Sequence, residues 1–221
     1  MREAQRGRRR VHQIWATHPE EWAGATAATA EDIAARCGSD AHQGVCAEVD
    51  PYPYAAADDL LAAPAPLIVA LDEVTDPQNL GAVARTAEAV GATGVVIPER
   101  RSAEVTAAVA KASAGAVEHL AIARVRNLAD FLIEARDGGA WSYGAAAGEG
   151  AVPYTEPDWN GAIVLVLGSE GRGLRPRVAA ACDGLVALPM RGRIGSLNVS
   201  AAAAALLYGI LQCRDVLDSD P

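Results

Sequence analysis

The sequence is poor in the features that mark membrane, secreted and zinc-binding proteins. No apolar run approaches the roughly 20 residues that a membrane helix needs, and the arginine-rich start lacks the apolar stretch of a secretory signal. The four cysteines form no Cys-x-x-Cys pair, and the spacing of Cys37, His42 and Cys46 matches no usual zinc pattern. We therefore expect a cytoplasmic protein without a metal or a dense disulfide framework.

Lysine is almost absent, since Lys111 is the only one, and the formal net charge is -9. A uniform negative charge would argue against a nucleic-acid partner, but local clusters set the field that a phosphate meets. Arginine suits bidentate phosphate contacts, although a GC-rich coding bias would produce the same preference. The arginines do cluster, at residues 2 to 10, 100 and 101, 124 and 126, and 191 and 193.

The order of apolar and helical patterns predicts an α/β protein with a mostly parallel sheet. With 221 residues, 51% of them hydrophobic, the chain can form one domain of ordinary size plus a small appendage. Apolar, β-branched runs alternate with helical patterns from Leu67 onward, as in βαβ units. We expect a small N-terminal domain with its linker at 1–62 and the main domain at 63–221. Residues 148–160, rich in glycine, proline and acidic side chains, are expected to form an exposed loop.

Polar residues follow three of the predicted strands of the main domain. Asn79 lies where a helix is expected to begin, and Arg85 lies six residues further on, roughly on the same side. An asparagine cap and a solvated arginine would explain this first pair equally well. The other two stretches are a glycine-rich turn at 168–173 and a basic loop at 191–195, which leads into a helix expected from Leu197. Because ligands bind beyond the carboxyl ends of parallel strands, one pocket could use all three.

These stretches resemble a known family. "DPQNLGAVARTAEAVGATGVVIP", "LVLGSEGRGL" and "LPMRGRIGSLNVSAAAAALLY" resemble the three motifs of the SpoU family of RNA ribose 2'-O-methyltransferases, of the SPOUT class, over about residues 67 to 213. "SDAHQGVCAEVDPYPY" further resembles the end of the small substrate-binding domain of bacterial 23S rRNA guanosine 2'-O-methyltransferases. Such enzymes enter that domain through an additional strand and helix, so a truncated small domain is one expectation here.

The resemblance implies a C-terminal trefoil knot, a homodimer, S-adenosylmethionine as cofactor and 23S rRNA as substrate. It implies catalytic roles for Arg85, Asn79, Glu170, Ser196 and Asn198. Arginine is effectively always protonated, so we expect Arg85 to stabilise a developing alkoxide, with its action as a base left open. The cofactor is expected to contact Gly168, Leu188, Leu197, Leu167 and Met190, and the RNA to contact Arg8, Arg9, Arg10, Arg191 and Arg193.

Two other functions fit the same residues. The catalytic motifs are equally compatible with ribose methylation of tRNA, which only the substrate domain can distinguish. A non-catalytic RNA-binding module with the same fold is the other alternative, and the complete set of polar motif residues argues against it.

Overall fold

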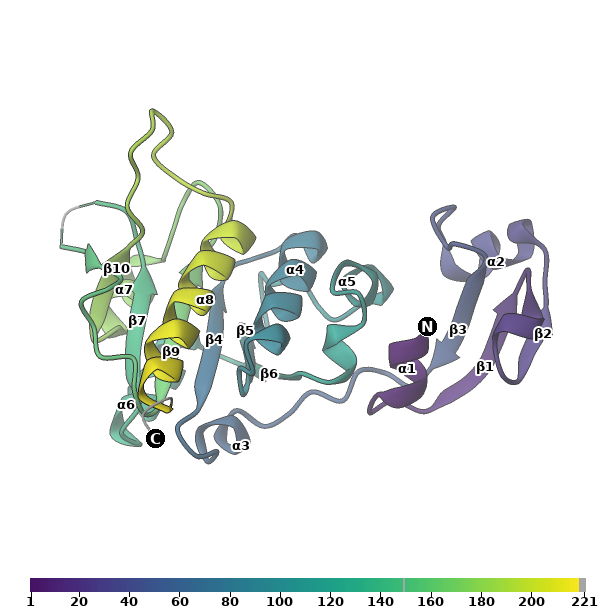
Figure 1. Ribbon diagram of the computed structural model, residues 1–221, viewed down its shortest axis with the longest axis horizontal. Coiled ribbons are helices and arrows are strands. Elements are labelled where there is room, and N and C mark those ends of the chain that lie inside the picture. The colour runs from purple at the N-terminus through teal and green to yellow at the C-terminus, as the bar shows by residue number, and fades with distance from the viewer. Residues whose placement is uncertain (149, 219–221) are drawn as a thin grey trace. The chain divides into compact units, whose positions relative to one another are not determined.

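The computed structural model describes residues 1–148 and 150–218 of the chain (Figure 1). It divides into two compact units, Met1–Pro53 and Tyr54–Pro221, and each has its own sheet. The sequence analysis placed residues 54–62 in the linker, whereas the structure packs this segment on the larger unit. The Ala55 amide donates to the Ile122 carbonyl at 2.9 Å, and Leu60 lies buried in the core of that unit.

The smaller unit is a three-stranded sheet with short helices. Its central strand β1 pairs in parallel with β2 and antiparallel with β3. Ile14, Ala16 and Ile33 form its buried apolar residues. Helix α2 has a well-defined start, because Thr29 and Asp32 form a capping box. The elements are α1 (Arg2–Arg6), β1 (Val11–Ala16), the 3-10 helix η1 (Pro19–Glu21), β2 (Ala25–Ala27), α2 (Ala30–Cys37) and β3 (Val45–Val49).

The larger unit is a seven-stranded sheet in the order β6-β5-β4-β9-β7-β10-β8, and every strand pair in it is parallel. Its strands are β4 (Leu67–Asp72), β5 (Gly94–Pro98), β6 (Ala121–Val125), β7 (Trp141–Ala145), β8 (Val152–Pro153), β9 (Ile163–Gly168) and β10 (Gly184–Ala187). Its helices are α3 (Ala57–Leu61), α4 (Pro77–Ala89), α5 (Ala107–Ala112), η2 (Ala116–Glu118), α6 (Leu128–Asp137), α7 (Pro176–Ala181) and α8 (Val199–Asp218).

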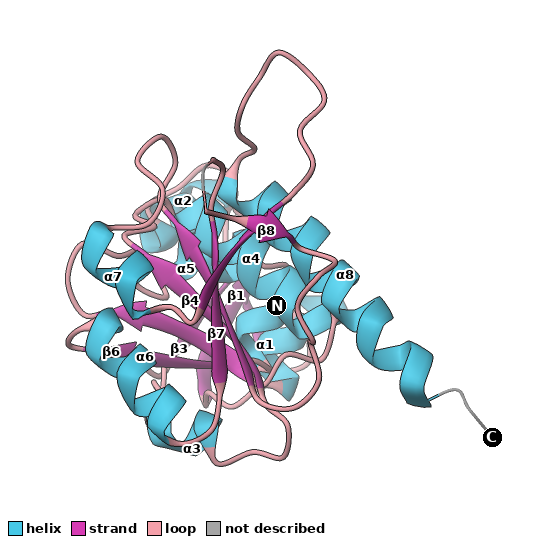
Figure 2. Ribbon diagram, turned by 90° about the vertical axis from the view of Figure 1, so that its left-hand side faces the viewer, coloured by secondary structure: helices cyan, strands magenta, loops and turns pink. Residues whose placement is uncertain are grey.

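Helices cover both faces of this sheet. The central strands β4 and β9 are buried along almost their whole length, as expected for parallel strands between two helical layers. Figure 2 shows α3, α6 and α7 on one side of the strands and α4 and α8 on the other. The loop of residues 188–198, between β10 and α8, stands out from the carboxyl edge of the sheet (Figure 1). All strand ends that carry polar motif residues therefore lie at one edge.

The predicted α/β class and the mostly parallel sheet are confirmed, and one local prediction is wrong. Residues 150–160 are not simply an exposed loop, because Val152 and Pro153 form β8 and pair with β10. Trp159 is only 2% exposed, and its indole N–H donates to the Tyr154 carbonyl at 2.8 Å. The glycine, proline and acidic residues of this segment gave no indication that one buried tryptophan fixes it to the core.

Among the described residues, no helix is long and apolar enough to cross a membrane.

Candidate functional site

The site is built on two central strands that end side by side. β4 and β9 pair in register, and their last residues, Asp72 and Gly168, are partners. The chain leaves β4 toward helix α4, which carries Asn79, and leaves β9 into the turn that carries Glu170. The loop after β10 ends at the start of α8, which packs against α4. Three distant parts of the sequence thus meet at one edge, as the parallel sheet predicts.

Three polar side chains from these parts are joined by hydrogen bonds. Asn79 donates from Nδ2 to Oε1 of Glu170 at 2.9 Å, and Asn198 donates from Nδ2 to Oδ1 of Asn79 at 3.0 Å. The Asn198 amide also donates to Oε1 of Glu170. One carboxylate oxygen therefore receives two amide donors. The other, Oε2, accepts no hydrogen bond within the described residues, so it can face an incoming group.

Asn198 uses the two ends of its amide for different purposes. Its Oδ1 accepts from the backbone N–H of Ser200 at 2.8 Å and from the Ser200 hydroxyl at 2.6 Å, which caps helix α8. Its Nδ2 faces Asn79 and Glu170. A cap alone would explain only half of this arrangement. The helix begins at Val199, two residues later than expected, so Asn198 is its cap and Ser196 lies in the preceding loop.

Asn79, by contrast, is not a helix cap. Helix α4 begins at Pro77, and Asp76 caps it by accepting from the Gln78 N–H at 3.0 Å. Asn79 therefore lies inside the first turn, where its side chain is available for Glu170. A role as helix cap therefore does not explain Asn79. Its contacts with Glu170 and Asn198 explain why an amide lies at this position.

A cavity of about 340 Å³ opens beside this cluster. Its volume lies in the range of roughly 300 to 1,000 Å³ that small-molecule sites occupy. All five residues that we expected to contact the cofactor line it, together with Glu170 and Ser196. A smaller cavity of about 140 Å³ adjoins it through Ser169, Glu170 and Val199, and Asn79 lines that one. The residues of the larger cavity that we expect to contact the cofactor are Leu167, Gly168, Leu188, Met190 and Leu197.

The turn after β9 forms one wall of the larger cavity. The Gly173 N–H donates to the Ser169 carbonyl at 2.9 Å, which closes the turn at its neck, and Gly173 has a positive φ of 67°. A Cβ on Gly168 would lie 2.2 Å from the carbonyl carbon of Gly173. Close approach of backbone atoms therefore excludes a side chain at this position. In the structure the close neighbour is the turn's own backbone.

The structure does not bring every predicted site residue into contact. Arg85 is exposed on α4, and within the described residues it makes no hydrogen bond with the cluster of Asn79, Glu170 and Asn198. Arg191 and Arg193 are exposed in the loop of residues 188–198. The predicted RNA-binding arginines of the smaller unit, Arg8, Arg9 and Arg10, connect α1 to β1, and the outer two are exposed.

Sequence reasoning missed one buried ion pair at the base of the site. Asp72, the last residue of β4, is 0% exposed and accepts from Arg175, the residue before α7. A carboxylate that ends the otherwise apolar strand "LIVALD" was the available signal. The small residues Ala145, Ala146 and Ala147, which also line the larger cavity, carry no such signal.

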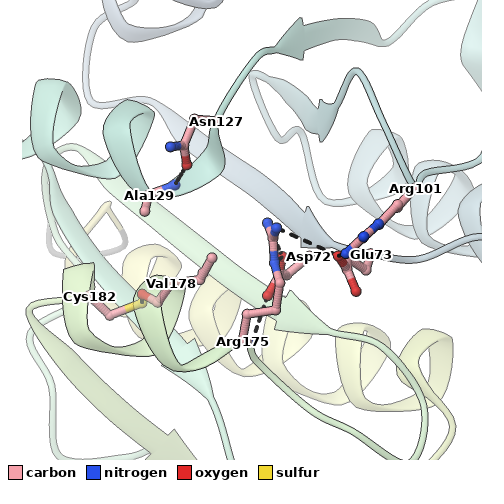
Figure 3. Close-up of polar contacts among 8 residues, drawn as sticks. All are labelled: Asp72, Glu73, Arg101, Asn127, Ala129, Arg175, Val178 and Cys182. Atoms are coloured by element: carbon pink, nitrogen blue, oxygen red, sulfur yellow. Dashed lines mark hydrogen bonds and ion pairs between the residues drawn. The ribbon is translucent and has the colours of Figure 1, made fainter.

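The half-buried cysteine that follows α7, Cys182, is not a candidate nucleophile. Burial raises the pKa of the Cys182 thiol to about 12, and the nearby carboxylates of Asp183 and Asp72 act in the same direction. Its sulfur lies 3.3 Å from the Val178 carbonyl (Figure 3). Because the thiolate is the reactive form, this cysteine stays inert at neutral pH.

Comparison with known proteins identifies the class of the chain. Residues 66–208 match the model of the SpoU rRNA Methylase family. The chain is 46% identical over 179 residues to YacO of Bacillus subtilis, whose name places it among TrmH family tRNA/rRNA methyltransferases; the match covers 79% of this chain and 72% of YacO. It is 44% identical to a tRNA/rRNA methyltransferase of Synechocystis, over 78% of this chain and 46% of that protein.

Solved structures agree with this class. An AdoMet-bound rRNA methyltransferase from Sinorhizobium meliloti matches with a TM-score of 0.80 and 26% identity, over 92% of this chain and 80% of that one. AviRb of Streptomyces viridochromogenes matches with a TM-score of 0.81 over 97% of this chain and 87% of its own, and at 24% identity it supports the fold alone.

The chain belongs to the SpoU rRNA Methylase family. It is an RNA methyltransferase, and S-adenosylmethionine is its methyl donor, as the sequence predicted. The trefoil knot, the homodimer and the individual roles of the site residues stay predictions.

Proposed function

We propose that the protein transfers a methyl group to a ribose 2'-hydroxyl, that of a guanosine in 23S rRNA. The observation that carries this proposal is the cluster of Asn79, Glu170 and Asn198 beside a cavity of ligand size. A chain that only bound RNA would need neither the cavity nor a carboxylate held by two amides. We place the enzyme in the cytoplasm, where ribosomal RNA is made in bacteria.

The larger cavity suits the methyl donor. Leu167, Leu188 and Leu197 offer apolar surface for a flat purine ring, and the glycine-rich turn exposes backbone polar groups for the hydroxyls of a ribose. Glu170 lines the same cavity and would supply a negative charge there, which suits a positively charged sulfonium donor. S-adenosylmethionine, when bound, supplies an activated methyl group. The residues present therefore fit the donor.

Arg85, on the exposed side of α4, is assigned to the RNA side of the reaction. A ribose hydroxyl is a poor nucleophile, and it must approach the methyl group in line while it loses its proton. A permanently protonated guanidinium stabilises the oxygen as negative charge develops on it, and it can also hold a neighbouring phosphate. The free oxygen of Glu170 is suited to orient Arg85 or the ribose hydroxyl.

The smaller unit supports rRNA over tRNA as substrate. The S. meliloti structure, described as an rRNA methyltransferase, covers 92% of this chain. A structure described by 2-OH methylation of C/U34 on tRNA covers 68%, with a TM-score of 0.61 and 27% identity. The part of this chain that the tRNA enzyme covers is no larger than the larger unit. Because the rRNA enzyme covers more of the chain, we assign the substrate preference to the smaller unit.

A homodimer completes the proposal. The loop of residues 188–198 and helix α8 expose large apolar side chains, a composition that suits a protein interface. Ile194 is 73% exposed, and Leu197 and Tyr208 are each almost half exposed. A second copy of the chain that covered this surface would also enclose the donor cavity, because Leu197 lines it.

A methylation assay tests the proposed function. Purified protein, methyl-labelled donor and either total rRNA or total tRNA are incubated separately. We expect label in 23S rRNA. The backbone should resist alkaline cleavage after one ribose, because methylation blocks the 2'-hydroxyl that this cleavage needs. Label in tRNA alone would support the alternative substrate, and binding of RNA without any transfer would support a non-catalytic module.

A further inference from the structure

A row of charged side chains lies at the carboxyl edge of the sheet. Arg175 lies between Asp72 and Glu73, and Arg101 approaches Glu73 from its other side (Figure 3). Arg101 follows β5, Asp72 ends β4, and Arg175 follows the turn after β9. The row therefore connects three neighbouring strands, and none of the functional assignments above uses it.

Asp72 and Arg175 form the tightest part of this row. Asp72 is completely buried and accepts two hydrogen bonds from Arg175, from the backbone N–H to Oδ2 at 2.8 Å and from Nε to Oδ1 at 2.7 Å. A terminal guanidinium nitrogen forms an ion pair with the same Oδ1 at 2.7 Å. The Arg175 side chain is 41% exposed and also approaches Glu73 at 3.5 Å. Both the main chain and the side chain of Arg175 are thus fixed on the end of β4.

This pair holds the base of the turn that forms the cavity wall. The turn leaves β9 at Gly168 and returns at Leu174, immediately before Arg175. Its neck is closed by the bond from Gly173 to Ser169, and its tip carries Glu170. At the tip the only side-chain bonds to Glu170 from other described residues come from Asn79 and Asn198. A rigid base is what keeps the exposed tip within reach of those amides.

A purely stabilising role is a poor explanation for this arrangement. Only Asp72 is fully removed from water, and the cost of burying its charge offsets much of its attraction to Arg175, so the pair adds little net stability. What it does provide is direction, since one oxygen of Asp72 accepts from the backbone N–H of Arg175 and the other meets its guanidinium, which ties main chain and side chain to the same carboxylate. Here that attachment determines where residues 168–174 lie, and six of them line the cavity.

We propose that Asp72 and Arg175 are positioning residues for methyl-donor binding, because they fix the turn of residues 168–174 on the end of β4. The proposal rests on the proposed function of the same cavity. Neither residue lines the larger cavity, so they act through the turn and not by touching the donor. Disturbing the pair moves the cavity wall and withdraws Glu170 from Asn79 and Asn198.

The test compares Arg175→Lys and Asp72→Asn with a matched control, Arg177→Gln. Arg177 lies two residues after Arg175 and forms a single exposed ion pair with Asp130 at 2.7 Å, away from the turn. For each protein we would measure donor affinity by calorimetry, turnover at saturating donor, KM for RNA and the melting temperature. Lysine keeps the charge but replaces a planar group of several donors by one ammonium.

We expect Arg175→Lys to melt within a few degrees of the parent and to bind the donor about tenfold more weakly, with lower turnover at saturating donor. In Arg175→Lys the KM for RNA should change less than twofold. In the Arg177→Gln control the donor affinity, the turnover and the KM for RNA should each change less than twofold. Asp72→Asn should follow the pattern of Arg175→Lys, and if it fails to fold, the lysine variant still decides. Normal donor affinity in a folded Arg175→Lys protein would overturn the positioning role. Absence of donor binding in the parent would instead contradict the proposed function.

Discussion

The side chain of Asn198 donates a hydrogen bond to that of Asn79, 119 residues earlier in the chain, at 3.0 Å. The two amides share Glu170 as a common acceptor. This contact joins the start of α8 to the first turn of α4, beside the turn after β9 that carries Glu170. It is the most direct structural expression of the three sequence motifs, because each motif contributes one residue to it.

The cluster predicts a specific effect of Asn198→Asp. Aspartate caps a helix as well as asparagine does, so helix α8 should start normally. The variant loses both Nδ2 donors and places a second carboxylate against Glu170. We expect turnover to fall by about 100-fold, within the range for loss of one catalytic donor. Ser200→Ala is the control, since it removes a contact within the cap and leaves the cluster intact. Near-normal turnover of Asn198→Asp would contradict the cluster's role.

Arg85→Ala should abolish methyl transfer while donor affinity stays almost unchanged. Arg85 lines neither cavity, whereas a charged group directed at developing charge contributes several kcal/mol to the transition state. Calorimetric titration of the donor beside a methylation assay separates the two effects. If turnover survived in the folded variant, Arg85 would have to be removed from the catalytic residues.

Gly168→Ala should damage the cavity wall itself. The added Cβ would lie 2.2 Å from the backbone of Gly173, so the turn must move. Overpacking of this kind costs about 1 to 3 kcal/mol, and donor binding should weaken with it. Gly192→Ala serves as control, because a Cβ there meets no atom within 4 Å. Unchanged thermal stability and donor affinity in Gly168→Ala would show that the turn tolerates displacement.

The arginines between α1 and β1 should supply most of the RNA affinity. Each phosphate contact adds about 0.7 to 0.9 to the slope of log affinity against log salt, so replacing Arg8, Arg9 and Arg10 by glutamine should flatten it by about 2 to 3. Donor binding should not change. RNA binding across a salt series, with Arg191 and Arg193 replaced in parallel, measures this. If replacing Arg8, Arg9 and Arg10 left the slope unchanged, the RNA-binding surface would have to lie on the larger unit.

Sequence patterns predicted the part of the fold that depends on short-range periodicity. β4, β5 and β9 correspond to the apolar, β-branched runs expected from Leu67 onward, because parallel strands buried on both faces read as continuous apolar segments. β8 was missed because a two-residue edge strand leaves no periodic signal, and its anchor is one buried tryptophan. Helix α4 begins at Pro77, before the start expected near Asn79, because Asp76 provides its cap.

The site was predictable in composition but not in its contacts. The motifs identified Asn79, Glu170 and Asn198, yet only the structure shows that the asparagines bind the same carboxylate oxygen. The pair of Asp72 and Arg175 lies 103 residues apart in sequence and belongs to no local pattern. Such long-range pairs depend on strand order, which apolar periodicity does not determine.

The proposed function is methylation of a ribose of ribosomal RNA. We would test it by mapping 2'-O-methylation across rRNA and tRNA in cells with and without the protein. We predict that one ribose methylation, on a guanosine of 23S rRNA, disappears without the protein and returns with the parent sequence but not with Arg85→Ala. An unchanged rRNA map together with the loss of a tRNA methylation would contradict the claim.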